Sequence, residues 1–193
     1  MTLVLETQRL RMTPVTTADL DLALEMFTDP DVMRFIGGTM SEADVRAEMA
    51  LWTKRGGEGG VGIWCIADRL TNETFGSGFL LPVPIEDIDT NWDNVVPGIM
   101  PEGDVEVGYT LKQSAWGKGY ATEACQRLIR FAFEETPLQE VVATFDDDNT
   151  ASRNVLAKSG LKDCGRRRAY RTDCPDWRIT RQEWAAANTR AHP

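Results

Sequence analysis

A glycine-rich turn directly before a long predicted helix is the segment most suited to chemistry. It reads Trp116-Gly117-Lys118-Gly119-Tyr120-Ala121-Thr122 and follows a strand-like run at 105–111. Glycines one residue apart let the backbone turn and approach a ligand closely. The first N–H groups of the helix have no partners within it, and the helix dipole is positive at that end. The pattern favours an anion site suited to a pyrophosphate, although a turn that only starts a helix has the same pattern.

The residue types present exclude several kinds of catalysis. The only histidine is His192, one residue from the last, so we expect neither a Ser-His-Asp or Cys-His group nor a histidine-ligated metal. No two cysteines form a C-x-x-C pair. Cys65 and Cys125 fit buried reduced thiols, whereas Cys164 and Cys174 can face each other across a hairpin. We predict no metal site, and acid–base work falls to carboxylates, hydroxyls, thiols or water.

The charge balance bears on partners. The 193 residues carry a net charge of −9, and binding to a phosphate backbone depends on Lys and Arg. An acidic chain suits a cationic partner better, although acidity often serves only solubility. No apolar run approaches the ~20 residues of a membrane span, and Met1 to Glu6 is too short and too soon charged for a signal peptide. We expect a cytoplasmic protein that binds neither nucleic acid nor a membrane.

The elements that position the glycine turn follow an irregular order without repeats or linkers. Capping boxes at Thr16 and Ser41 begin two helices, and further helices are predicted at 120–135 and 150–159. Strands are predicted at 10–15, 61–67, 74–83, 105–111, 141–145, 161–170 and 177–184. This order predicts an α/β (α+β) fold in one domain, 1–193 with a core at about 8–185, built on a mixed sheet of about six to seven strands with helices on both faces.

The glycine turn and two flanking segments together resemble the GNAT acetyltransferases. In that family the pyrophosphate loop reads Gln/Arg-x-x-Gly-x-Gly/Ala between the fourth strand and the third helix. Residues 116–124 are especially similar to the branch that contains the ribosomal-protein N-terminal acetyltransferases. The resemblance continues in Glu106-Val107-Gly108-Tyr109 and in residues 149–161, which are similar to that branch's Asn-x-x-Ser…Lys-x-Gly-Phe segment. It implies acetyl-CoA as co-substrate and direct acetyl transfer to a primary amine in a ternary complex.

The resemblance also assigns residues to the co-substrate. The backbone of the fourth strand is expected to hold the pantetheine arm and the thioester carbonyl, and the glycine turn is expected to hold the pyrophosphate. Arg153 is a further cation that either approaches the phosphates or stays solvated. The predicted contacts are Val107, Gly108, Tyr109, Trp116, Gly117, Lys118, Gly119, Tyr120, Ala121, Thr122, Asn149, Ser152 and Lys158.

Glu106 and Ser152 are the predicted catalytic residues. Glu106 lies on the strand face opposite Val107 and Tyr109, where it can take a proton from the amine through water. An ordinary solvent-facing glutamate fits the same pattern. Ser152 lies one helical turn after Asn149, and its hydroxyl can meet the thiol sulfur. Asn149 is also a typical helix cap.

Two positions depart from the family pattern. Position 114 is Ser where the family prefers Gln or Arg. Position 156 is Leu where many members carry a tyrosine that protonates the departing thiolate, so no tyrosine acid is carried over to that position. The ribosomal-type branch also tends to lack this tyrosine, which favours that branch.

The acceptor is predicted from the long loop at 84–104. In the resembling fold this loop lies where the amine enters, and here it has no Lys or Arg, Trp92 in its middle and six carboxylates: Glu86, Asp87, Asp89, Asp93, Glu102 and Asp104. Such a loop attracts a cationic amine, although a solvated, mobile insertion has the same composition. The acceptor is a protein N-terminus, an antibiotic or a polyamine on this interpretation, and a homodimer is one possible assembly.

Two other functions compete with catalysis by this domain. A non-catalytic acyl-CoA-binding sensor or interaction domain needs the same glycine turn and differs only in lacking turnover. A dinucleotide-binding oxidoreductase needs G-x-G-x-x-G after an N-terminal strand, and the glycine pair here lies late in the chain without the third glycine. The sequence therefore favours an acetyl-CoA-dependent acyltransferase.

Overall fold

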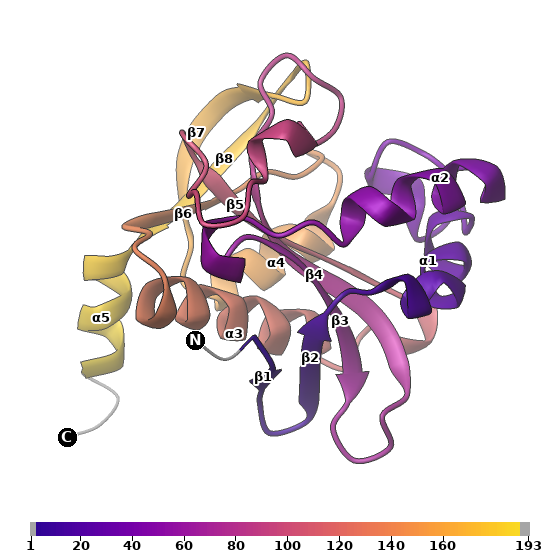
Figure 1. Cartoon of the computed structure of the whole chain (residues 1–193). Coiled ribbons are helices and arrows are strands. Elements are labelled where there is room, and N and C mark those ends of the chain that lie inside the picture. The colour runs from indigo at the N-terminus through magenta and orange to yellow at the C-terminus, as the bar shows by residue number, and fades with distance from the viewer. Residues whose placement is uncertain (1–2, 190–193) are drawn as a thin grey trace.

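The computed structural model describes residues 3–189 and contains an eight-stranded sheet in the order β1-β2-β3-β4-β5-β6-β8-β7 (Figure 1). Neighbouring strands are antiparallel except β5 and β6, which are parallel. The strands are β1 (Leu5–Glu6), β2 (Leu10–Pro14), β3 (Gly62–Asp68), β4 (Thr74–Pro82), β5 (Val105–Leu111), β6 (Glu140–Ala143), β7 (Lys162–Ala169) and β8 (Thr172–Thr180). The predicted mixed sheet is confirmed, but its strand number was underestimated. Two-residue β1 is too short to show alternation, so the pattern could not reveal it.

Helices cover both faces of this sheet, as predicted. They are α1 (Leu20–Phe27), α2 (Glu42–Trp52), α3 (Tyr120–Glu135), α4 (Thr150–Lys158) and α5 (Arg181–Thr189), with short 3₁₀ turns at Thr17–Asp19, Met33–Phe35, Gly57–Gly59, Trp92–Asn94 and Gln113–Ala115. Thr16 and Asp19 form the expected capping box, and the Ser41 side chain accepts from the Asp44 N–H at the start of α2. Each cap satisfies N–H groups that the first turn leaves unpaired.

The core lies in two layers, one on each side of the sheet. Helix α3 is buried along most of its length, from Ala124 to Phe133, and packs on β4, β5 and α4. Trp64 of β3 and Phe131 of α3 meet edge to face, with ring centroids 5.4 Å apart. The opposite layer joins α1 and α2 to the other face of the sheet through residues such as Met49, Trp52 and Leu81. The remaining stripe of α3 is polar, with Gln126, Arg130 and Glu134 exposed, so the helix is amphipathic with a wide apolar face.

The predicted last strand, 177–184, is wrong at its end. Strand β8 stops at Thr180 and α5 begins at Arg181. The Glu183 carboxylate accepts from the Thr180 N–H at 3.0 Å, and the Thr180 hydroxyl accepts from the Glu183 N–H at 3.2 Å. Thr180-Arg181-Gln182-Glu183 is therefore a capping box, a local signal that a strand assignment across it overlooked.

The hairpin of β7 and β8 does not bring the two late cysteines together. Cys174 is buried opposite Arg167 in the register, and its thiol donates to the Arg167 carbonyl oxygen at 3.6 Å. Cys164 is exposed and lies where the pairing of β7 with β8 is irregular. The expectation that Cys164 and Cys174 face each other is therefore wrong, because the hairpin pairs Cys174 with Arg167 and Asp163 with Trp177, which leaves Cys164 three positions from the partner of Cys174. Within residues 3–189, no helix is both long and apolar enough to cross a membrane.

Candidate active site

Strands β5 and β6 pair at one point and then separate. Strand β5 pairs with β4 along all seven of its residues, but its register with β6 contains only Glu106 opposite Val142. Beyond Glu106, the β6-facing edge of β5 has no strand partner in the described chain. An unpaired strand edge offers N–H and C=O groups to an extended ligand, which can bind as an added strand. The separation therefore leaves room for a pantetheine-like arm alongside Val107 to Leu111.

The glycine turn has the backbone conformation that a phosphate loop needs. Gly117 and Gly119 have φ of +72° and +81°, in the left-handed region that favours glycine, and Gly119 is the N-cap of α3. A Cβ on Gly117 would meet nothing within 4 Å, and one on Gly119 would meet only Arg9 at 3.5 Å. The space beside both glycines is therefore open to a ligand, and the start of a 16-residue helix faces it.

Glu106 is buried at the point where β5 and β6 pair. It is 3 % exposed, so it is not the solvent-facing glutamate of the alternative interpretation. The Thr144 hydroxyl donates to Glu106 Oε2 at 3.2 Å, and the Tyr170 hydroxyl donates to Glu106 Oε1. Burial raises the pKa of Glu106 to about 8, while Thr144 and the charge of Arg167 oppose the shift. A carboxyl with a pKa near neutrality is suited to taking and releasing a proton.

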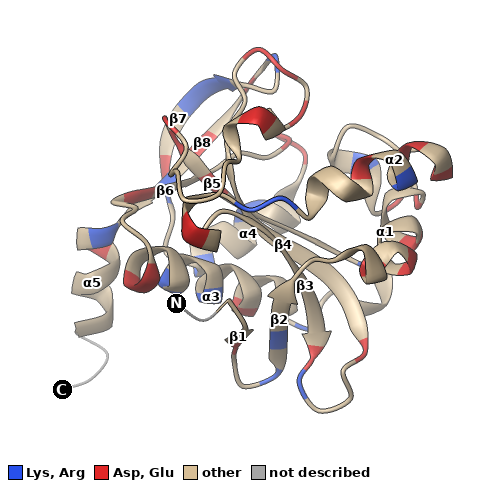
Figure 2. Ribbon diagram, viewed as in Figure 1, with Lys and Arg blue, Asp and Glu red and all other residues tan. Residues whose placement is uncertain are grey.

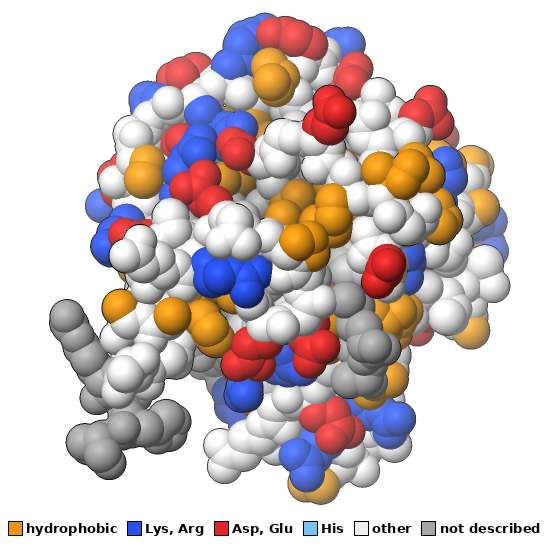
Figure 3. Space-filling model, turned by 60° about the vertical axis from the view of Figure 1, so that its left-hand side comes forward, with side chains coloured by type: hydrophobic (Ala, Val, Ile, Leu, Met, Phe, Trp, Pro, Cys, Tyr) orange, Lys and Arg blue, Asp and Glu red, His pale blue; other side chains and the backbone are white. Residues whose placement is uncertain are grey.

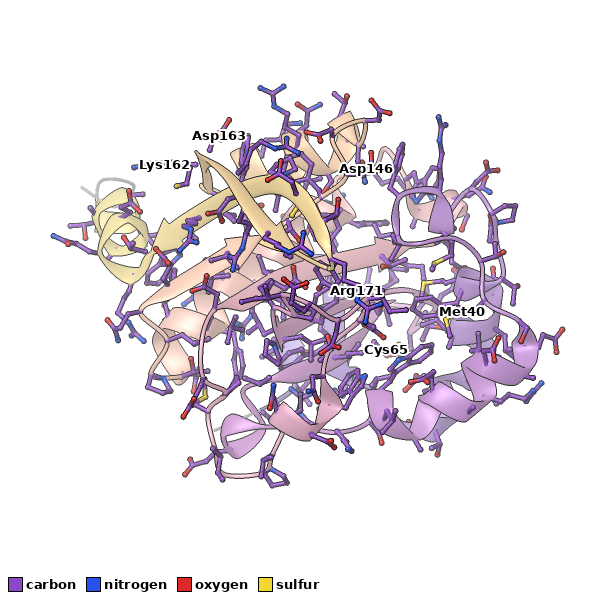
Figure 4. All side chains as sticks on the ribbon, turned by 90° about the horizontal axis from the view of Figure 1, so that it is seen from above. Met40, Cys65, Asp146, Lys162, Asp163 and Arg171 are labelled. Carbon is purple, nitrogen blue, oxygen red and sulfur yellow. The ribbon has the colours of Figure 1, made fainter. Side chains whose placement is uncertain are left out.

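Sequence reasoning missed the residues that surround Glu106. Tyr170 lies 64 positions away, in the tight turn between β7 and β8, with φ of +51°. Its N–H donates to the Pro84 carbonyl oxygen at 3.0 Å and the Arg171 N–H donates to the Ile85 carbonyl oxygen at 3.0 Å. Seen from above, the hairpin extends over the sheet and ends at Arg171 (Figure 4). The local sequence contains no signal for a contact that depends on where this hairpin ends.

A half-buried network of ion pairs includes Arg167, whose charge acts on Glu106. The Arg167 guanidinium is 2.9 Å from Asp104 and 3.6 Å from Asp176, and its side chain is 14 % exposed. Arg178 contacts the same two carboxylates and also Glu140. Taken from the sequence alone, the run Arg166-Arg167-Arg168 predicts a solvent-facing strand edge. This is wrong for Arg167, because side chains alternate along a strand: Arg166 and Arg168 point outward and Arg167 points inward.

Ser152 lies against Tyr109, on the other face of β5 from Glu106. Their hydroxyl oxygens are 3.0 Å apart, and Asn149 caps α4 by accepting from the Ser152 N–H at 3.0 Å. Burial raises the pKa of Tyr109 above its ordinary value. The structure thus places a tyrosine hydroxyl beside the predicted acid, although Leu156 occupies the position where the family's tyrosine acid is expected. The spacing of Tyr109 on β5 and Ser152 on α4 gave no indication of this contact.

The other predicted contact residues lie around the glycine turn and α4. Trp116 is 48 % exposed and its indole N–H donates to the Leu111 carbonyl oxygen at 2.8 Å. Tyr120 stacks on Phe75, while Ala121 and Thr122 are half-buried in the first turn of α3. Lys118 is exposed in the turn, and Arg153 and Lys158 are exposed on α4. A Cβ on Gly108 would lie 2.0 Å from the Phe79 ring, so packing requires this glycine whatever its role toward a ligand.

A groove of about 460 Å³ lies beside the base candidate. It is lined by Leu51, Lys54, Asp87, Ile88, Asp89, Thr90, Asn91, Trp92, Asp93 and Arg171. One groove residue, Arg171, directly follows Tyr170, which contacts Glu106. Another, Asp89, carries a charge that raises the pKa of Glu106, although burial raises it more. The groove is therefore connected to the buried carboxyl through the Tyr170–Arg171 turn, while Glu106 itself does not line it.

The 84–104 loop is less acidic toward solvent than its composition suggests. Glu86 pairs with Arg168, and Asp104 pairs with Arg167 and Arg178. Figure 2 shows red and blue segments close together at the top of the molecule, around β7 and β8. On the face drawn in Figure 3, acidic and basic side chains lie beside one another, not in a patch of one sign. A tryptophan in the middle of a loop is expected to offer its ring to a cation or an apolar group. Trp92 instead packs into the α1–α2 layer and is buried, although it also lines the groove. Hydrophobic packing of the large ring explains this burial.

A metal-dependent reaction would need a cluster of ligand side chains. Residues 3–189 contain no group of three or more His, Cys, Asp and Glu arranged to hold a metal ion. His192, the residue on which the exclusion of histidine catalysis depended, lies outside the described residues.

Comparison with known proteins identifies the family. The model of the family described as the acetyltransferase (GNAT) domain matches residues 9–162. This is most of the chain, and the chain therefore belongs to the GNAT acetyltransferases, as the motifs predicted. It is an acetyltransferase enzyme with the GNAT fold.

Individual relatives agree with this family. The uncharacterized protein YkkB of Bacillus subtilis (strain 168) is 31% identical over 137 residues, which are 70% of this chain and 71% of YkkB. The FsC-acetyl coenzyme A-N(2)-transacetylase of Aspergillus fumigatus is 29% identical over 160 residues, 81% of this chain and 64% of that protein. A putative ribosomal N-acetyltransferase of B. subtilis, YdaF, is 38% identical over only 63 residues, 33% of this chain and 34% of YdaF.

A solved structure supports the fold. The aminoglycoside acetyltransferase AAC(6')-Ib in complex with coenzyme A superposes with a TM-score of 0.71 at 16% identity, covering 93% of this chain and 99% of that one. At this identity the similarity establishes the fold alone.

Proposed function

We propose that this acetyltransferase moves the acetyl group of acetyl-CoA directly onto a primary amine in a ternary complex. The observation that carries the proposal is a buried carboxyl with a raised pKa, Glu106, at the one point where β5 and β6 pair and under the Tyr170–Arg171 turn, which borders a solvent-open groove. The separated strands accommodate the pantetheine arm and the glycine turn accommodates the pyrophosphate. The groove accommodates the amine, so both substrates meet near Glu106.

In the proposed reaction Glu106 takes the proton that the amine loses. The amine nitrogen attacks the thioester carbonyl carbon, the C–S bond breaks, and the products are an N-acetyl amine and CoA. The carboxylate removes the proton directly or through one water, and low polarity around it makes its pKa suitable for this role. Thr144 and Tyr170 each donate a hydrogen bond to Glu106, which holds the carboxyl in one orientation.

A hydroxyl on the other face of β5 supplies the proton for the departing sulfur. Ser152 and Tyr109 share a hydrogen bond, and Tyr109 retains its proton because burial raises its pKa. The variants Ser152→Ala and Tyr109→Phe identify the donor: the variant lacking it loses kcat while its affinity for CoA is retained. Full kcat in both would assign this proton to water.

The branch of the family, the extent of the domain, the cellular location and the assembly are proposed from the sequence. We place the chain in the branch of the ribosomal-protein N-terminal acetyltransferases on residues 116–124 and 149–161, with the short match to YdaF as support. We also treat the chain as one domain, with its core at about residues 8–185. A cytoplasmic location and a homodimer remain predictions, and the sedimentation behaviour of the purified protein tests the second.

The test of the proposed function is binding followed by turnover. Acetyl-CoA should raise the melting temperature, because a ligand that binds only the native state stabilises it. A panel of amines should then contain an acceptor that the enzyme acetylates, with release of free thiol. Binding without turnover of any amine would favour the non-catalytic acyl-CoA sensor, and absence of binding would overturn both.

The acidic residues that line the groove allow a test of whether the acceptor is cationic. Replacing Asp87, Asp89 and Asp93 with Asn should raise KM for a cationic amine about 3- to 30-fold and leave KM for acetyl-CoA unchanged, because exposed acids concentrate a cation locally. The kcat/KM of the native enzyme should also fall as salt rises, since exposed charges are screened over ~10 Å at 0.1 M.

Matched acids elsewhere provide the control. Glu73, Glu134 and Glu135 are exposed and lie outside the groove, so their replacement by Gln changes the net charge equally. This control should leave KM for the amine unchanged. A neutral amine as best acceptor, used equally at low and high salt, would remove the steering role from the loop.

A further inference from the structure

The turn between β1 and β2 is docked on the glycine turn from the side. Arg9, in this turn, donates from Nη1 to the Lys118 carbonyl oxygen at 2.9 Å and from Nε to Glu123 Oε2 at 2.7 Å. The Arg9 N–H also donates to Glu123 Oε1 at 3.0 Å, and the Thr7 hydroxyl donates to the same oxygen. These contacts connect positions more than 100 residues apart, so no local pattern predicts them.

The Arg9 guanidinium is held in place by an aromatic ring as well. It lies 4.7 Å from the centroid of the Tyr120 ring, which itself stacks on Phe75 at 4.8 Å. A cation over an aromatic face gains energy in a fixed orientation. The side chain remains 44% exposed, so it borders the open space beside Gly119 without being buried.

The bond to Lys118 determines which way one peptide group points. A trans peptide is planar, so the Lys118 carbonyl oxygen and the Gly119 N–H point to opposite sides. With Arg9 on the carbonyl oxygen, the Gly119 N–H is directed away from Arg9. The glycine itself does not prevent the reverse orientation, because a residue without Cβ tolerates φ of either sign. A reversed peptide would present a carbonyl oxygen to the anion in place of a donor.

Arg9 also balances a charge near the proposed anion site. Glu123 lies in the first turn of α3, and its side chain is 19% exposed. An unpaired carboxylate there would repel a pyrophosphate at the same helix end. The ion pair with Arg9, 2.6 Å from Nη2 to Oε2, offsets this repulsion.

We propose that Arg9 is a positioning residue for the pyrophosphate: it orients the Lys118–Gly119 peptide so that the Gly119 N–H faces the co-substrate. This inference rests on the proposed function, because it assigns the glycine turn to the pyrophosphate. Arg9 acts through the turn and needs no contact with phosphate itself.

The test compares ligands with and without phosphate groups. Arg9→Met should weaken CoA binding about 10- to 100-fold in calorimetry, the effect of losing a charged hydrogen bond. Binding of 3'-dephospho-CoA should weaken by the same factor, because it retains the pyrophosphate. The kcat/KM for S-acetylpantetheine, which has no pyrophosphate, should stay within about twofold of the native value.

Two further variants separate positioning from general damage. Arg69→Met removes a bond from Arg69 Nη1 to the Thr7 carbonyl oxygen, 2.9 Å, in the same β1–β2 turn, and should leave CoA affinity unchanged. Glu123→Gln keeps Arg9 and its bond to Lys118, so affinity for CoA should be retained or improved. Melting temperatures of all variants without ligand check that each is folded.

Several results would overturn the inference. A loss for CoA but not for 3'-dephospho-CoA would mean that Arg9 contacts the 3'-phosphate directly. An equal loss with S-acetylpantetheine, or a loss in Glu123→Gln as large as in Arg9→Met, would indicate disruption of the helix start. If Arg9→Met binds CoA as tightly as the native protein does, the role of Arg9 is refuted and the proposed function stands. Absence of CoA binding by the native protein refutes the proposed function with it.

Discussion

Replacing Glu106 with Gln is expected to lower kcat about 10- to 1000-fold, because the amide cannot accept the proton of the amine. Gln is isosteric: its carbonyl oxygen accepts from one of the Thr144 and Tyr170 hydroxyls, and its amide N–H donates to the other hydroxyl oxygen, so the local structure should be retained. CoA affinity should be unchanged, since the turn that holds the pyrophosphate lies at the other end of β5. Steady-state kinetics with saturating acetyl-CoA, together with calorimetry for CoA, measure both quantities.

A carboxylate on the neighbouring strand provides the control. Glu140 on β6 pairs with Arg178 and keeps a side chain that is 35% exposed, so Glu140→Gln removes a carboxylate from the neighbouring strand without touching the groove. This variant should retain kcat within about threefold. Equal losses in both variants would mean that the sheet's electrostatics, and not proton transfer by Glu106, account for the effect.

The pH dependence follows from the raised pKa of Glu106. The base is active when ionised, so kcat should rise with pH and level off above about pH 8 in the native enzyme. The acceptor should have an amine with a pKa of ~10, so that the ionisation of the amine and that of Glu106 occur at different pH values. The rise of kcat that levels off near pH 8 should be absent in Glu106→Gln. A native profile with no inflection near pH 8 would contradict the assignment of Glu106 as base.

The same pKa predicts a change in stability. Between the ordinary value of 4.5 and the folded value of about 8, the native state keeps a proton that the unfolded state has released. The free energy of unfolding therefore falls as pH rises through this window. Glu106→Gln has no such proton, so its urea midpoint should fall less between pH 5 and pH 8 than that of the native protein.

Replacing Gly119 with Val is expected to abolish the increase in melting temperature that CoA produces. Gly119 has φ of +81°, which a β-branched residue adopts only with strain, and the added side chain would fill the space beside the start of α3. We expect CoA affinity to fall at least about 100-fold, since the donors that face the pyrophosphate would move. Thermal shift and calorimetry with CoA test this expectation.

Gly37 offers a control with matched strain. It has φ of +84°, and a Cβ there would meet nothing within 4 Å, as at Gly117. Gly37→Val should lower the melting temperature without ligand by a similar amount and leave the CoA-induced shift intact. If Gly119→Val retained native affinity for CoA while Gly37→Val behaved the same way, the glycine turn would not be the pyrophosphate site.

The sequence by itself determined the features whose causes are local. Glycines at 117 and 119, the helix that follows them and the capping boxes at Thr16 and Ser41 depend on neighbours within a few residues, so their spacing could be interpreted directly. The element order followed from such signals, and with the motifs it was enough to predict the GNAT family. The capping box at Thr180 was missed, because the alternating pattern of the preceding strand was extended across it.

Only the tertiary structure decided what surrounds the reacting groups. Glu106 is on an amphipathic strand in the sequence, and it is buried because Thr144 and the hairpin turn at Tyr170, 38 and 64 positions away, close over it. Arg9 reaches the glycine turn from 109 positions away, and Arg167 turns inward to neutralise Asp104. Burial and charge pairing depend on which segments meet in space, and chain spacing contains no information about those distances. The pKa of Glu106 is therefore a property of the fold and not of its strand.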